Sequence, residues 1–176
     1  MAIFAKALGN GHPIAAVLGT AQAMEGANTS FISSTYWTES VGPVAALAVL
    51  EKMQKINVVD HIDHIGKKVI QIWKSASEKQ SVEITICENR PCITHFTFNN
   101  KYANKLKTIY TILMLERGFL ATPSIYPTLA HNDENISLYG NAINEVYAII
   151  AELLQSNKVD DFLTTPEAHT GFSRLT

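Results

Sequence analysis

The chain has 176 residues, of which 47% are hydrophobic and 17% are charged, a balance typical of a globular protein with one full-sized domain or slightly more. Fourteen basic and sixteen acidic residues give a formal charge of -2 without a basic run, which argues against a nucleic-acid partner. No stretch reaches the roughly twenty apolar residues of a membrane span, and the N-terminus lacks the basic region of a signal peptide. Cys87 and Cys92 are the only cysteines, too few for a disulfide framework. We therefore expect a cytoplasmic protein without a membrane partner.

Two apolar runs of strand length flank the first lysine of the chain. Residues 1–5 and 14–18 are apolar, which predicts two short buried strands. Between them, Lys6 is followed by a Gly-Asn-Gly-His-Pro loop at residues 9–13, where glycine permits tight turns and proline stops a helix. An apolar strand that begins at Met1 has no polar lead-in, so we expect the chain to start inside a domain.

The next forty residues change from short elements to a longer helix. Residues 20–27 predict a short helix, and the serine- and threonine-rich stretch 28–40 has no helical or strand period, which indicates an ordered loop. A helix is predicted from Gly42-Pro43 to about Lys55 because proline is tolerated in the first turn. Its apolar stripe is expected to be buried and consists of Val44, Leu47 and Leu50.

The remainder of the chain predicts three more helices and a few short strands. Strands at 83–86 and 93–98 can pair as a hairpin, with Phe96 and Phe98 on one face and His95 and Thr97 on the other. Asn132 can cap the last long helix, and the tail from residue 156 is expected to be irregular. The other predicted elements are a helix at 60–78, a helix at 101–117 that ends at Gly118, and extended pieces at 119–121 and 124–126.

These elements predict two parts of different kinds. Residues 1–40 carry strands and loops that cannot form a complete domain, whereas residues 41–176 supply four helices around a small, mostly antiparallel sheet. The second part can be a self-sufficient α+β unit.

Lys6 is the first candidate for chemistry. A lysine at the end of a buried strand is a candidate Schiff-base nucleophile, although most lysines are solvated surface groups. His61 and His64 lie three residues apart beside Asp60 and Asp63, a pattern that an ordinary solvated helical face explains, and we expect no metal site. His95 and His131 are expected to be packing or hydrogen-bonding groups.

The lysine segment must be considered together with a second segment about thirty residues later. Residues 5–19 read A-K-A-L-G-N-G-H-P-I-A-A-V-L-G, and the later segment reads S-S-T-Y followed by G-P-V-A-A-L-A-V-L-E. This combination resembles the class III pyridoxal-phosphate aminotransferases, and within them the branch similar to glutamate-1-semialdehyde aminomutase. The resemblance continues through R-G-F-L-A at 117–121 and A-H-N-D-E-N-I at 130–136.

The resemblance implies an α/β fold of the fold-type-I pyridoxal-phosphate transferases. Residues 1–40 would be the C-terminal part of the large cofactor-binding domain, and residues 41–176 the small C-terminal domain with its linking helix. Lys6 would form a Schiff base with pyridoxal 5'-phosphate and move a proton on the substrate. Thr35 would bind the cofactor phosphate of the neighbouring subunit in a homodimer. The substrates would be an amine or amino acid and a carbonyl acceptor.

The chain also departs from the family pattern. The family places a phosphate loop, a stacking aromatic ring and an aspartate for the ring nitrogen upstream of the lysine, but only five residues precede Lys6. Ser40 stands where a basic residue is expected. We therefore expect a C-terminal portion that transfers amino groups within a complete enzyme. The alternatives are a catalytically silent dimerisation or complementation module and, less favoured, a lysine aldolase without a cofactor, which would not need the threonine loop.

Overall fold

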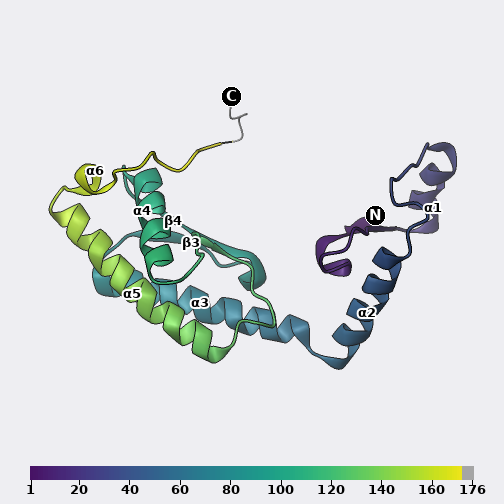
Figure 1. Cartoon of the computed structure of the whole chain (residues 1–176), viewed down its shortest axis with the longest axis horizontal. Helices are drawn as coiled ribbons and strands as arrows, with labels where there is room; N and C mark the ends of the chain where they lie inside the picture. The colour runs from purple at the N-terminus through teal and green to yellow at the C-terminus, as the bar shows by residue number, and fades with distance from the viewer. Residues whose placement is uncertain (172–176) are drawn as a thin grey trace. The chain divides into compact units, whose positions relative to one another are not determined.

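The computed structural model describes residues 1–171. The chain divides into two compact units, Met1–Val58 and Val59 onward, and Figure 1 shows the elements of each. None of the helices in the described part of the chain is long and apolar enough to cross a membrane.

The first unit begins with a two-stranded antiparallel hairpin. Strands β1 (Ala2–Phe4) and β2 (Ala16–Leu18) pair in the register Ala2↔Leu18, which confirms the two predicted strands. Their burial was predicted wrongly, because Ile3 is 73% exposed and Leu18 is 58% exposed. Within residues 1–171, the sheet of this unit consists of these two strands alone.

The rest of the first unit follows the predicted order of elements. The short helix α1 (Ala21–Met24) is capped by Thr20 and continues into the 3-10 turn η2 (Glu25–Thr29). The loop after it has neither helix nor strand, and helix α2 (Val41–Lys55) then begins. The apolar stripe of α2 is exposed rather than buried, with Val44 at 64% and Leu47 at 62% exposure. The helical period correctly identified the apolar face of this helix, but a period does not show whether another element packs against that face.

The second unit contains the remaining helices and a three-stranded sheet. Its sheet has the order β3-β4-β5 with antiparallel pairs, in the registers Ile84↔Phe98 and Thr94↔Ile125, which confirms the predicted hairpin. The elements of this unit are α3 (Val58–Gln80), β3 (Ile84–Cys87), the 3-10 turn η3 (Pro91–Ile93), β4 (Thr94–Phe98), α4 (Ala103–Glu116), β5 (Ser124–Ile125), α5 (Asp133–Gln155) and α6 (Val159–Phe162).

An aromatic cluster forms the core of the second unit. Phe96 and Phe98 point inward from β4, whereas His95 and Thr97 are exposed, as the alternation predicted. The Phe96 ring centroid lies 4.9 Å from that of Trp73 on α3 and 5.4 Å from that of Tyr110 on α4. These edge-to-face contacts join the sheet to both helices.

The ends of the long helices match the sequence signals. The Asn132 side chain accepts a hydrogen bond from the Asn135 N–H at 2.9 Å and so caps α5. Helix α4 ends before Gly118, whose φ of +81° is a left-handed conformation that favours glycine. The tail prediction was wrong in part, because α6 forms within it and the Ala168 N–H donates to the Thr108 hydroxyl of α4. Residues 172–176 of the predicted irregular tail lie outside the described residues.

Candidate active site

Lys6 lies two residues after the last residue of β1, Phe4, and adopts an unusual backbone conformation. It begins the 3-10 turn η1 (Lys6–Leu8), and its φ is +50°. The left-handed region costs a residue with a Cβ roughly 1–2 kcal/mol. The turn is held because the Lys6 carbonyl accepts hydrogen bonds from the N–H groups of Gly9 at 3.2 Å and Asn10 at 3.0 Å. Backbone strain of this kind is concentrated at functional sites.

The Lys6 side chain is exposed and unpaired among the described residues. Within residues 1–171, its Nζ has neither a hydrogen-bond partner nor an ion-pair partner. An unpaired primary amine on a fixed backbone can attack an aldehyde.

The loop after Lys6 closes through further left-handed residues. Asn10 has φ +44° and Gly11 has φ +104°, and the His12 N–H donates to the Gly9 carbonyl at 3.2 Å. These values explain the Gly-Asn-Gly pattern, because asparagine and glycine tolerate such angles best. The residues therefore shape the turn, as the sequence suggested.

The loop ends against the first turn of α2. A Cβ added to Gly42 would lie 2.6 Å from the Pro13 carbonyl oxygen and 3.2 Å from the Ile14 Cβ. Only glycine permits this approach of the helix to the loop. The first turn of α2 therefore supports the segment that carries Lys6.

Thr35 begins a turn that leads into the same helix. The turn covers residues 35–38 and is exposed. The Tyr36 N–H donates to the Ser34 hydroxyl at 3.2 Å, and the Glu39 N–H donates to the Tyr36 carbonyl at 3.1 Å. In the described part of the chain, the Thr35 hydroxyl and N–H have no partner. Two adjacent donors of this kind suit a phosphate group.

Glu39 is a residue of this region that the sequence interpretation missed. Its carboxylate accepts hydrogen bonds from the N–H groups of Val41 at 2.5 Å and Gly42 at 3.0 Å. These bonds, the Gly42 bond foremost, hold the pKa of the Glu39 carboxyl below its usual value. An acidic residue just before a predicted helix was the available signal, because carboxylates are favourable at helix N-termini.

The structure therefore places both predicted site residues in the first unit, one before α2 and one before β2. Lys6 and Thr35 do not bond to each other within residues 1–171. Both of their segments instead reach the first turn of α2, one through Gly42 and the other through Glu39.

His61 and His131 form hydrogen bonds in the second unit. The His61 Nε2 lies 3.0 Å from the His131 carbonyl oxygen, and the His131 Nδ1 accepts a hydrogen bond from the Thr128 N–H at 3.1 Å. His131 is thus a hydrogen-bonding group, as predicted. Asp63 pairs with Lys67 at 2.6 Å. Among the residues described, no three His, Cys, Asp or Glu side chains gather as metal ligands would.

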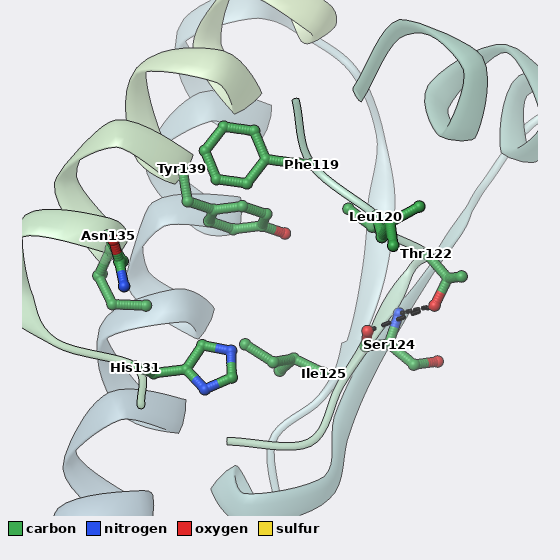
Figure 2. Close-up of a pocket in the computed structure, with 10 residues that line it drawn as sticks. Phe119, Leu120, Thr122, Ser124, Ile125, His131, Asn135 and Tyr139 are labelled. Atoms are coloured by element: carbon green, nitrogen blue, oxygen red, sulfur yellow. Dashed lines mark hydrogen bonds between the residues drawn. The ribbon is translucent and has the colours of Figure 1, made fainter. Parts of the chain in front are cut away.

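A cavity of about 270 Å³ lies between β5, the segment after α4 and the N-terminal half of α5. Figure 2 shows the Phe119 and Tyr139 rings on one side of it and His131 beside Ile125 on another. Apart from His131, its lining side chains are apolar or neutral polar groups. The lining residues all fall between Phe119 and Tyr139, but the local sequence pattern did not indicate that the extended segment and the helix would enclose a cavity.

Comparisons with known proteins place the chain in a family. The family described as aminotransferase class-III matches residues 1–156. The 3-aminobutyryl-CoA aminotransferase of Cloacimonas acidaminovorans (strain Evry) is 28% identical over 160 residues, which are 88% of this chain and 38% of that protein. The structure of the PLP internal aldimine form of the Sphingopyxis sp. MTA144 FumI protein matches with a TM-score of 0.79 at 17% identity.

The structural match covers 88% of this chain and 37% of the FumI chain. The chain thus spans well under half the length of these relatives, and its fold corresponds to part of a fold-type-I pyridoxal-phosphate enzyme. Because the family match extends over most of the sequence, the chain belongs to the class III aminotransferases, a family of pyridoxal-phosphate enzymes.

Proposed function

We propose that this chain takes part in pyridoxal-phosphate-dependent amino-group transfer, with Lys6 as the residue that binds the cofactor covalently. The observation that carries the proposal is the strained, left-handed Lys6 with an exposed and unpaired amine at the start of a closed turn. The free hydroxyl and N–H of Thr35 supply donors for a phosphate. The donor set therefore fits the aldehyde and the phosphate of the cofactor.

Lys6 has two tasks in this proposal. When bound, pyridoxal phosphate supplies an electron sink that acidifies the carbon next to the substrate nitrogen. The Lys6 Nζ holds the cofactor until the substrate amine displaces it. The released amine then acts as a base and an acid, and moves a proton at that carbon.

Thr35 is proposed to bind the phosphate in the neighbouring subunit of a homodimer. The apolar surface of the first unit supports an assembly, since Trp37 is 70% exposed and Val44 is 64% exposed. Exposed apolar surface of this kind is what a partner subunit would bury.

The proposed division of the chain follows from this assignment. Residues 1–40 are the C-terminal part of a large cofactor-binding domain, and residues 41–176 are the small domain. The chain spans well under half the length of its relatives, which supports the proposal that it works as one portion of a complete enzyme; a cytoplasmic location is part of the same proposal. The proposed substrates are an amine or amino acid and a carbonyl acceptor, and the proposed branch is the one similar to glutamate-1-semialdehyde aminomutase.

The alternative is a silent module that dimerises or complements another polypeptide without binding cofactor through Lys6. The exposed apolar side chains of α2 favour this function as much as they favour a dimeric enzyme. Covalent binding of the cofactor by Lys6 distinguishes the enzyme from the silent module.

Titration of the purified chain with pyridoxal phosphate tests the proposal. The absorbance of lysine-bound cofactor should develop in the wild type and in Lys52→Ala, a control that removes a lysine of α2, and should be absent from Lys6→Ala. Turnover of an amine in the same sample would exclude the silent module. Equal binding by Lys6→Ala and the wild type would refute the assignment of Lys6.

A further inference from the structure

We propose that Glu39 is a positioning residue. It fixes the Thr35 turn to the first turn of α2, the same helical turn that contacts the Lys6 loop, and so sets the position of the phosphate donors. This inference rests on the proposed function, because it assumes that Lys6 binds the cofactor aldehyde and Thr35 the cofactor phosphate.

Glu39 bonds to the Thr35 turn through its backbone and to helix α2 through its side chain. Its backbone N–H donates to the Tyr36 carbonyl at 3.1 Å and closes the turn that begins at Thr35. Its carboxylate accepts from the N–H groups of Val41 and Gly42 at 2.5 and 3.0 Å. A single residue therefore connects the turn to the helix through both backbone and side chain.

Helix α2 depends on Glu39 for its cap. Ser40 occupies the N-cap position, yet its side chain makes no capping hydrogen bond. The carboxylate of the preceding residue takes this role, which places a negative charge at the positive end of the helix dipole. Loss of the carboxylate would therefore release the turn as well as the first N–H groups of the helix.

The opposite side of the same helical turn contacts the Lys6 loop. Gly42 donates its N–H to Glu39, and its α-carbon packs so closely that an added Cβ would lie 2.6 Å from the Pro13 carbonyl oxygen. His12 in this loop also lowers the pKa of the Glu39 carboxyl electrostatically. The first turn of α2 is thus a common anchor, with Glu39 on the Thr35 side and Gly42 on the Lys6 side.

The test compares two aldehydes that differ only in the phosphate. The full-length chain is incubated with pyridoxal phosphate or with pyridoxal, and borohydride reduces the C=N bond between the aldehyde carbon and the amine. Peptide mass spectrometry then measures the labelling of Lys6. The ratio of the two labelling efficiencies reports the contribution of the phosphate, which general destabilisation would not change.

Glu39→Ala should lower this ratio about fivefold, the effect of losing a helix cap, while pyridoxal labelling stays at the wild-type level. Glu39→Gln keeps one acceptor and should lower it roughly threefold. Gly42→Ala pushes on Pro13 and should lower labelling by both aldehydes. Glu25→Gln should change nothing, because Glu25 accepts only from the Asn28 side chain. Backbone hydrogen exchange in Glu39→Ala should rise at residues 35–42 and not in the second unit.

The outcomes separate the two proposals. An unchanged ratio in Glu39→Ala, with Lys6 labelled in the wild type, would overturn the inference and leave the proposed function intact. An equal loss of labelling by both aldehydes would show a merely structural role and would also overturn it. Absence of Lys6 labelling in the wild type would refute the proposed function, and the inference would fail with it.

Discussion

Removal of one buried hydroxyl should stabilise the second unit. Tyr147 lies on α5 with 0% exposure, and within residues 1–171 its hydroxyl is buried without a hydrogen-bond partner. Burial raises the pKa of this phenol well above its usual value, which reflects the same lack of solvation. We expect Tyr147→Phe to increase the free energy of unfolding.

The magnitude follows from two opposing effects. An unsatisfied buried hydroxyl costs about 1–3 kcal/mol. The phenylalanine ring keeps the contacts with Phe96 and Phe98, whose centroids lie 6.1 and 6.2 Å away. The lost oxygen leaves a void of about 10 Å³, which costs roughly 0.2 kcal/mol. The net gain should be about 1 kcal/mol, or about 4 °C in Tm for a unit of this size.

Tyr110→Phe is the matched control. The Tyr110 hydroxyl lies 3.0 Å from the Tyr139 hydroxyl, which also accepts the Trp73 indole N–H at 2.8 Å. The same chemical change should therefore cost about 1 kcal/mol here. Urea unfolding followed by the fluorescence of Trp73, in a Trp37→Phe background, measures both variants. Destabilisation by Tyr147→Phe similar to that by Tyr110→Phe would refute the claim that the Tyr147 hydroxyl is unsatisfied.

Three further predictions concern the cap of α5, its first turn and the proposed sharing of the site between two subunits. Asn132→Ala removes the acceptor for the Asn135 N–H and should cost about 1 kcal/mol in urea unfolding. The Lys68 ammonium, 2.6 Å from Asp133, lowers the pKa of that carboxyl. The stability it contributes is thus complete above a pH of about 4 and is lost as pH falls through the lowered pKa, so Asp133→Asn should flatten the dependence of Tm on pH below 4. Mixing Lys6→Ala with Thr35→Ala chains should restore about a quarter of the wild-type Lys6 labelling if each site is shared by two subunits, whereas no recovery would refute a shared site.

The sequence predicted the second unit better than the first because its signals were local and repeated. Helices α3 and α5 carry long apolar stripes, and Asn132 supplied a recognisable cap. The alternation of β4 identified Phe96 and Phe98 as core residues. Helix α6 was missed because four residues are too few to show a period.

The candidate site was predictable only at the level of residue types. Lys6 and Thr35 stood out through the family resemblance, but Glu39 was missed because an acidic residue before a helix is a common pattern that does not by itself identify a site residue. Side-chain bonds to N–H groups two and three residues ahead depend on the backbone path of the loop. Local pattern does not specify that path.

The exposed apolar faces of the first unit bear directly on how the site works. Leu47 and Val44 stay solvated in this chain, although burying a side chain of either kind is worth about 1.5–3 kcal/mol. A partner surface that covers α2 would therefore bind with a large hydrophobic gain and would also immobilise the helical turn that Glu39 and Gly42 use as an anchor. In the proposed site, covalent capture of an aldehyde would require only the Lys6 amine, whereas transfer chemistry would need excluded water and fixed donors. When the assembly is diluted, turnover should therefore be lost before cofactor labelling is lost. This order distinguishes a reactive lysine from a complete catalytic site.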